Sequence, residues 1–255
     1  MKSYILIIYL TFCFCVGYAQ NNVPDVCKWR LNVSGGIGYY TANTSNDEKV
    51  LKNMGYDEKK VKHLFQDYKT GILGNVDFHY LLNENIGLGI RYAFFTTSGS
   101  LNQDFNNLPA SMGISVMPGF KATDYIHFAG PSLHARLLIG TRWIFSFCLS
   151  GGYAYYRGEF EEISNVFSLL PYTHIPFRAL TTGHAFGFSG GLGLEYFLNR
   201  RIALGLGIDY SHLSLSNLKV KTNMEWINQD LKDIINGENY DYSRLEFSLG
   251  VKIYF

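Results

Sequence analysis

The sequence is poor in charged residues, in proline and in long apolar runs. Asp, Glu, Lys and Arg account for 17% of the 255 residues, prolines number 6, and the formal net charge is +1. Soluble domains usually carry about 25% charged residues, and a nearly balanced charge gives no reason to expect a nucleic acid as partner. Beyond residue 20 no run approaches the roughly 18 apolar residues that a spanning helix needs, which argues against a bundle of membrane helices.

Cysteine is scarce as well. Two of the four cysteines lie in the apolar N-terminal segment, and the other two, Cys27 and Cys148, belong to no cluster with zinc-ligand spacing. Structural zinc sites need closely spaced cysteines and histidines. The sequence therefore predicts no metal site and no cofactor, and we expect Cys27 and Cys148 to remain free thiols.

The N-terminus has the pattern of a secretory signal peptide. Lys2 supplies a positive start, residues 4–16 are apolar but short for a membrane span, and Gly17 and Ala19 place small residues at the −3 and −1 positions. We expect cleavage before Gln20. The predicted organisation is a signal peptide at 1–19, a short periplasmic segment at 20–27 and a single domain at 28–255.

Eight later segments alternate between bulky apolar residues and small or polar ones. Alternation with period two is the signature of a β-strand whose two faces meet different surroundings. The segments are 28–40, 71–82, 86–97, 125–139, 143–155, 185–196, 202–211 and 244–255.

The connections between these segments alternate in length. Residues 83–85, 141 and 199–201 form tight turns, whereas 41–70, 98–124, 158–183 and 216–241 form long loops. Short turns at one end and long loops at the other are typical of outer-membrane barrels. We therefore predict an all-β fold, an eight-stranded antiparallel transmembrane β-barrel with short periplasmic turns, long and partly helical external loops, and both termini on the periplasmic side.

The apolar face is expected to point outward into lipid. Eight strands enclose a lumen that holds only a modest set of side chains, and the apolar set comprises dozens of Leu, Ile, Phe, Tyr and Trp residues. Two aromatic belts, as expected at membrane interfaces, support this orientation. The belt toward the loops comprises Tyr39, Tyr92, Tyr125, Tyr155, Tyr210 and Tyr242, and the belt toward the turns comprises Trp29, Tyr80, Trp143, Tyr196 and Phe255.

Two stretches near the C-terminus carry a family resemblance. Residues 190–198 read GGLGLEYFL, the turn 199–201 and the strand ALGLGIDY at 203–210 follow, and the chain ends with LEFSLGVKIYF at 245–255. In these stretches the chain resembles the OmpA-like outer-membrane β-barrel proteins common in Bacteroidetes, in their single-barrel form. The resemblance implies an outer-membrane location with lipid around the barrel. The terminal Phe255 resembles the signal that the barrel-assembly machinery reads.

The inward face carries ionisable residues of both signs. Because buried charges must be paired, the first hypothesis is a salt-bridged plug that closes the lumen, and the second is a proton path or narrow pore. The inward set comprises Arg30, Asp77, His79, Arg91, His134, Arg136, Glu195, Asp209, Arg244, Glu246 and Lys252.

A weak candidate catalytic site lies at the start of the last long loop. His212 and Ser214 share the outward parity of Tyr210, and Glu225 follows. This arrangement resembles outer-membrane lipid A deacylases, in which the histidine acts as base, the serine as nucleophile and the glutamate as orienting group. The surrounding motif is incomplete.

The long loops carry helical patterns. Ser45 with Glu48 forms a capping box, Gly55 is a helix stop, and Asp57 caps a second helix. That second helix places Val61, Leu64, Phe65 and Tyr68 on one face, and the last loop has a similar stripe of Met224, Ile227, Leu231, Ile234 and Ile235 that ends at Gly237. The apolar stretch 166–177 favours a packed cap. The alternative is an external binding surface in loops 41–70 and 216–241.

Three functions follow from these patterns. The leading hypothesis is a non-enzymatic outer-membrane barrel with a structural or surface-interaction role and an unidentified ligand. The alternatives are a small-solute or ligand channel and a lipid hydrolase.

Overall fold

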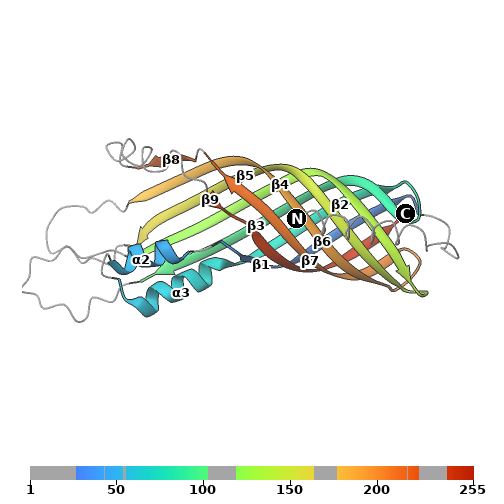
Figure 1. The fold of residues 1–255 in the computed structure, drawn as a ribbon, viewed down its shortest axis with the longest axis horizontal. Coiled ribbons are helices and arrows are strands. Elements are labelled where there is room, and N and C mark those ends of the chain that lie inside the picture. Colours follow the sequence, from blue (N-terminus) through green and yellow to red (C-terminus); the bar gives the residue numbers. More distant parts are fainter. Residues whose placement is uncertain are drawn as a thin grey trace, which may run out of the picture.

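The computed structural model describes residues 27–42, 44–53, 56–102, 119–163, 177–216, 218–223 and 240–255. The described strands form one elongated barrel, with the C-terminus at one end and two helices at the other (Figure 1). Within these ranges no helix has the length and apolar character needed to cross a membrane. The predicted signal peptide lies outside the described residues.

Eight long strands form the barrel wall. Each pairs antiparallel with its neighbours along the chain, and β1 pairs with β10 from Tyr40↔Arg244 to Arg30↔Tyr254, which closes the ring. The predicted eight-stranded antiparallel barrel is confirmed. The strands are β1 (Trp29–Tyr40), β2 (Thr70–Leu81), β3 (Ile86–Leu101), β4 (Gly119–Ile139), β5 (Trp143–Ile163), β6 (Arg178–Phe197), β7 (Ile202–Leu215) and β10 (Arg244–Tyr254).

Two short strands, which the sequence patterns did not predict, continue the wall. β8 (Lys219–Thr222) pairs with β6 beyond the end of β7. In the β6–β7 ladder Gly187 lies opposite Leu213, and in the β6–β8 ladder Thr182 lies opposite Lys219, one residue further along the chain than the β7 register would place it. A one-residue shift of this kind is a β-bulge. β9 (Tyr240–Asp241) pairs with β7 in the same register as β10, so β9 and β10 follow one line.

The three tight turns lie where the sequence predicts them. The side chain of Asn83 accepts the N–H groups of Asn85 and Ile86. Asn199 does the same for the two residues at the matching positions of the β6–β7 turn. Asparagine supplies such turn-closing contacts readily. The β4–β5 turn uses Gly140 at a φ of 69°, a conformation that glycine adopts without steric cost.

Four strands extend well into the predicted long loops. β3 continues to Leu101 and β4 begins at Gly119, within the predicted loop 98–124, while β5 and β6 reach into the predicted loop 158–183. The backbone ladder pairs Leu101 with Phe120 and Phe160 with Ala179. The alternation that marks a strand depends on one face meeting lipid. Above the lipid that contrast is lost, although the backbone hydrogen bonds continue.

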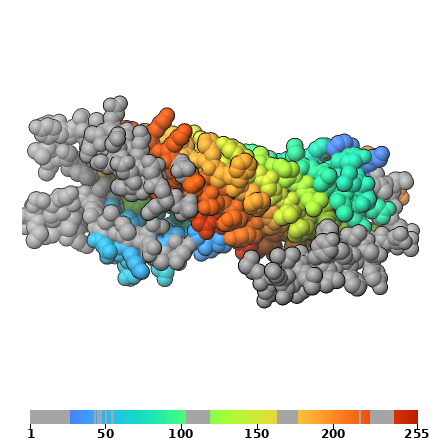
Figure 2. Space-filling view, turned by 45° about the horizontal axis from the view of Figure 1, so that its top comes forward, coloured from blue at the N-terminus to red at the C-terminus, as the bar shows by residue number. Residues whose placement is uncertain are grey.

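The outer wall is apolar. Large side chains are exposed along every barrel strand, including Ile72 at 68% and Phe186 at 80% of their surface, and the strands form a continuous wall on the face shown in Figure 2. Such a surface is unfavourable in water and stable in lipid. The outward placement of the apolar face is therefore as predicted.

One predicted belt residue is misplaced. Tyr242 lies inside, packed against Tyr40 and Tyr156. Its even position gives it the inward parity of Arg244, which reverses the orientation that we assigned from the sequence. It joins an apolar cluster inside the external end of the barrel, built from Tyr40, Leu73, Ala93, Phe95, Ile126, Phe128, Ala154, Tyr156, Leu213, Leu215 and Leu218.

Two helices occupy the first long connection. α3 (Glu58–Lys69) begins where predicted, because the side chain of Asp57 accepts the N–H groups of Lys59 and Lys60. α2 (Ser45–Asn53) corrects the predicted capping box: Ser45 is its first helical residue, and the hydroxyl of Thr44 contacts Glu48 at 3.1 Å. The predicted stop at Gly55, the apolar stretch at 166–176 and the stripe at 224–237 lie outside the described residues.

Helix α3 packs against the inner face of the extended strands. Its buried Val61 and Leu64 meet Leu101 of β3, with Phe65 and Phe120 at the margin. The contact is close, since a Cβ on Gly99 would lie 2.9 Å from Leu64 Cδ1. The helix thus adds an apolar layer at the external end, while its exposed face carries Lys59, Lys62, His63 and Gln66.

Candidate functional site

The lumen gathers all eleven ionisable residues predicted to point inward. Each of them is buried, and Arg136, the most exposed, retains 9% of its surface. Five are cations, four are carboxylates and two are imidazoles. They come from every barrel strand except β5, because each strand alternates and contributes its inward positions.

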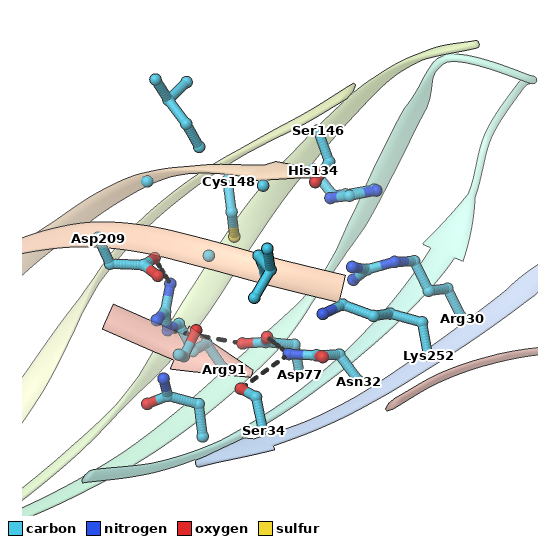
Figure 3. Close-up of a pocket in the computed structure, with 17 residues that line it drawn as sticks. Arg30, Asn32, Ser34, Asp77, Arg91, His134, Ser146, Cys148, Asp209 and Lys252 are labelled. Carbon is cyan, nitrogen blue, oxygen red and sulfur yellow. Dashed lines mark hydrogen bonds and ion pairs between the residues drawn. The ribbon is translucent and has the colours of Figure 1, made fainter. Parts of the chain in front are cut away.

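Arg91 holds the middle of this network. Its Nη1 lies 2.8 Å from Asp209 Oδ1, and its Nε faces Asp77 Oδ1 at 3.5 Å, an ion pair too long for a hydrogen bond. The amide of Asn32 donates to the other oxygen of Asp77 at 2.6 Å. Figure 3 shows Arg91 between the two carboxylates. Gly191 leaves the room that Asp209 needs, since a Cβ there would fall 2.2 Å from Asp209 Oδ1.

A second group lies nearer the short turns. Arg30 Nη2 pairs with Glu195 Oε1 at 2.6 Å, and the hydroxyl of Tyr254 donates to the other oxygen of Glu195 at 2.6 Å. The ring of His79 lies between Arg30 Nη1 at 3.5 Å and Ser132 Oγ at 2.9 Å. Every carboxylate oxygen of Glu195 therefore has a partner, as a buried charge requires.

The remaining charges lie above and below these groups. Arg244 pairs with Glu246 at 2.7 Å and covers the ring of Phe95 at 4.8 Å. At the other end, Arg136 Nε donates to the backbone oxygen of Glu84 at 2.6 Å. The Arg30–Glu195 and Arg91–Asp209 pairs join strands that are distant in sequence, so they tie the barrel together across its interior.

A small void lies among these side chains in the described part of the lumen. It measures about 50 Å³ and is lined by Arg30, Asn32, Asp77, Arg91, His134, Lys252 and their neighbours. That volume holds a few water molecules. Lys252 makes no hydrogen bond or ion pair within the described residues, and Figure 3 shows its ammonium beside Arg30. Ordered water fits the unpaired atoms here, which include Arg30 Nε, Asn75 Oδ1 and His134 Nε2.

Sequence reasoning missed the uncharged members of the network. Asn32, Ser132 and Tyr254 supply hydrogen bonds to Asp77, His79 and Glu195. Asn32 and Tyr254 share the inward parity of Arg30 and Lys252, and that parity was the available signal.

Cys27 and Cys148 are free. Among the described residues no group of three or more His, Cys, Asp or Glu is placed to hold a metal ion.

The candidate hydrolase residues do not assemble as a catalytic pair. His212 and Ser214 both point outward from β7, as their parity predicts. His212 Nδ1 contacts Ser243 Oγ at 2.8 Å rather than Ser214, which lies opposite Asp241. Ser243 is fully buried, so a substrate cannot reach its hydroxyl. Glu225 lies outside the described residues.

A buried carboxylate lies just above the membrane-spanning segments. Asp124 is 2% exposed and accepts hydrogen bonds from Tyr68 of α3 and Tyr156 of β5. The outward residues at this level include the charged pair Arg157 and Glu159, which places the level beyond the lipid. Burial raises the pKa of Asp124 to about 6, and the two tyrosine hydrogen bonds oppose that shift.

An apolar pocket lies above this carboxylate. It measures about 290 Å³ and lies between the helices and the inner faces of β4 and β5. The rings of Phe120 and Phe160 stack at 5.2 Å with an interplanar angle of 26°, which gives the pocket a flat wall. Its lining is Leu51, Leu64, Phe65, Tyr68, Phe120, Ala122 and Phe160.

Comparisons with solved structures find outer-membrane barrels. Neisserial surface protein A shares 11% identity at a TM-score of 0.41, over 89% of this chain and 97% of that one. The outer membrane protease OmpT from Escherichia coli shares 8% at 0.44, over 93% and 99%. The outer membrane protein OprG from Pseudomonas aeruginosa shares 12% at 0.40, over 92% and 99%. Likeness at this level carries no argument about activity.

Comparison with curated proteins found no match. A family profile described as the outer membrane protein beta-barrel domain matches residues 10–255, which includes every strand of the barrel. The closed sheet, the apolar exterior and the ionic interior agree with that match. The chain therefore belongs to the outer membrane protein beta-barrel domain family and resides in the outer membrane.

Proposed function

We propose that this protein is a non-enzymatic barrel with a closed lumen that anchors a ligand-binding external end in the outer membrane. The observation that carries the proposal is the contrast between the two interior spaces. The described lumen has a void of about 50 Å³ among charged side chains, whereas at the external end a partly open pocket of about 290 Å³ lies between apolar walls.

The filled lumen argues against a channel. A conducting pore needs a continuous polar path, but arginine–carboxylate pairs cross this lumen at the levels of Glu195 and Asp209, and the Arg244–Glu246 pair of β10 lies at a third level. Opening a path would require breaking buried pairs, which costs about 3–5 kcal/mol when a partner is left alone. The lumen therefore serves as a structural plug.

The external pocket fits a small apolar molecule. An engineered protein cavity of about 150 Å³ lined by Leu, Ile and Phe binds benzene, and this pocket is about twice that size. Its stacked phenylalanines would accommodate a flat ligand of two fused rings. The pocket includes residues of the predicted external ligand loop 41–70, namely Leu51, Leu64, Phe65 and Tyr68.

Planar-bilayer recordings test the closed lumen. The reconstituted wild-type barrel is expected to show no single-molecule conductance. A variant with Arg30, Arg91 and Arg244 all replaced by serine serves as the control for a lumen without its plug. Steady conductance by the folded wild-type barrel would contradict the proposal.

Photolabelling tests the pocket. A naphthyl diazirine applied to the barrel in lipid nanodiscs should label the peptides that carry Phe120 and Phe160. Ala122→Trp fills the pocket and should reduce that labelling several-fold, whereas the matched control Ala129→Trp, on the exposed face of the same strand, should leave it unchanged. Labelling confined to lipid-facing peptides in both proteins would refute the ligand site.

A further inference from the structure

Two tyrosine–histidine pairs repeat on the outer face of the barrel. The hydroxyl of Tyr92 on β3 meets Nδ1 of His127 on β4 at 2.8 Å. The hydroxyl of Tyr153 on β5 makes the same contact with Nδ1 of His184 on β6. In both pairs the tyrosine lies on the preceding strand, two residues before the position directly opposite the histidine. One local geometry thus occurs twice, one hairpin apart.

The two pairs belong to one transverse row. Phe94 lies opposite His127, His127 opposite Tyr155, and Tyr155 opposite His184. Successive ring centroids in this row are 5.1, 6.3 and 5.2 Å apart. The row crosses β3 to β6 and continues the aromatic belt that Tyr92 and Tyr155 mark at the external edge of the apolar wall.

The tyrosine contacts decide which ring nitrogen is available. A hydroxyl that donates to Nδ1 leaves the hydrogen of a neutral imidazole on Nε2, and a protonated imidazole carries a hydrogen there as well. Within the described residues neither Nε2 has a partner, since each ring is held through Nδ1 alone. Each histidine therefore presents Nε2 on the outer surface, and a phosphate there selects the tautomer in which Nε2 carries the hydrogen and the tyrosine hydroxyl donates to Nδ1.

A cation lies just beyond the row. Arg157 points outward two residues after Tyr155, opposite Tyr125 and Thr182, and its half-exposed guanidinium donates a hydrogen bond to the carboxylate of Glu159 through Nη2. Strand spacing puts His127 and His184 about 10 Å apart, with Arg157 about 7 Å further along the strand from Tyr155. His127 and His184 thus flank Tyr155 at the upper limit of the lipid-facing wall, and Arg157 lies just beyond it.

We propose that this row, defined by Phe94, His127, Tyr155 and His184 with Arg157 above it, binds phosphate groups of outer-leaflet lipids. Phosphate oxygens accept strong hydrogen bonds from imidazole N–H and guanidinium groups, and the acyl chains of the same lipid would lie on the apolar wall below. Lipid is the partner because the row is continuous with the lipid-facing surface. Because His127 and His184 lie about 10 Å apart, each imidazole would bind the phosphate of a separate lipid.

Native mass spectrometry of the detergent-solubilised barrel tests the site. The probes are phosphatidic acid and diacylglycerol with the same acyl chains, which differ in the phosphate. Wild type should bind phosphatidic acid more tightly than diacylglycerol. His127→Phe with His184→Phe keeps the aromatic area and removes both donors, so phosphatidic acid should bind roughly tenfold more weakly, the loss of one charge-assisted hydrogen bond.

Two controls separate this site from general effects. His63→Phe removes an exposed histidine on α3, away from the row, and should leave both lipid affinities unchanged. The heat-dependent shift in gel mobility verifies that each variant is folded. Equal phosphatidic acid binding by wild type and the folded double variant would overturn the proposal. So would displacement of the lipid by millimolar inorganic phosphate, because it would identify a free anion as the ligand.

Discussion

The phenol of Tyr68 in helix α3 donates a hydrogen bond to the carboxylate of Asp124 in β4. The contact joins the first external connection to the end of the barrel wall, 56 residues away in sequence. Burial and Asp124 also raise the pKa of Tyr68 well above its ordinary value, so it stays a donor at physiological pH. The helix is thereby held over the apolar cluster.

This contact predicts a pH-dependent attachment of α3. The pKa of Asp124 is about 6 in the folded protein, above its ordinary value of about 3.9. The state in which α3 is packed over Asp124 therefore binds more protons than the state in which α3 has opened, between about pH 4 and 6. The stability of the packed state falls as the pH rises through that window. Hydrogen exchange of α3 amides, corrected for intrinsic rates, should show easier opening at pH 7 than at pH 4.

Asp124→Asn is the matched variant. An asparagine cannot ionise, and its side chain still contacts both tyrosine hydroxyls, with its oxygen accepting from one and its NH2 group donating to the other. The exchange of α3 should therefore lose this pH dependence. An identical slope in wild type and variant would show that other groups are responsible.

Removing Arg91 should strongly destabilise the barrel. Arg91→Met leaves Asp77 and Asp209 buried without their cation, and breaking a buried pair in this way costs about 3–5 kcal/mol. Urea unfolding in lipid vesicles measures the change. Combining Arg91→Met with Asp77→Asn and Asp209→Asn removes the unpaired buried carboxylates and should recover part of the lost free energy of unfolding. A single variant as stable as wild type would contradict a structural role for the network.

Two glycines predict opposite outcomes for the same substitution. A Cβ on Gly89 would lie 1.9 Å from the backbone oxygen of Phe78, whereas a Cβ on Gly74 would meet nothing within 4 Å. Gly89→Ala should therefore force the β2–β3 ladder apart and destabilise the fold by roughly 1–3 kcal/mol, as overpacking does. Gly74→Ala should be neutral or slightly stabilising. Urea midpoints of the two variants provide the comparison.

Phe255 should matter more for assembly than for stability. Its backbone pairs with Trp29 in both directions, at 2.8 and 3.0 Å, while its ring is 52% exposed. Phe255→Ala keeps the backbone bonds, so unfolding in vitro should change little. The amount of assembled barrel in cells should fall several-fold if the assembly machinery reads this ring. Ile253→Ala, also outward on β10, is the control, and equal yields of the two variants would argue against the signal.

The sequence alone determined the wall of the barrel. Alternation in segments such as 202–211 and 244–255 identified the strands, their faces and the eleven inward ionisable residues, because lipid on one side and a narrow lumen on the other impose opposite chemistry on neighbouring positions. The asparagine turns followed from local hydrogen bonding. Where both faces lie outside lipid, as in β3 after Thr97, the pattern vanished and the strand ends were missed.

Tertiary structure decided which charges meet. Arg30 and Glu195 are 165 residues apart and Arg91 and Asp209 are 118 apart, and no periodicity relates them, because pairing across the lumen depends on the register and closure of the whole ring. The same closure brought His212 to Ser243 instead of Ser214. The sequence of a strand indicates which of its faces contacts lipid and which faces the lumen. The partner of an inward side chain instead depends on strands across the barrel.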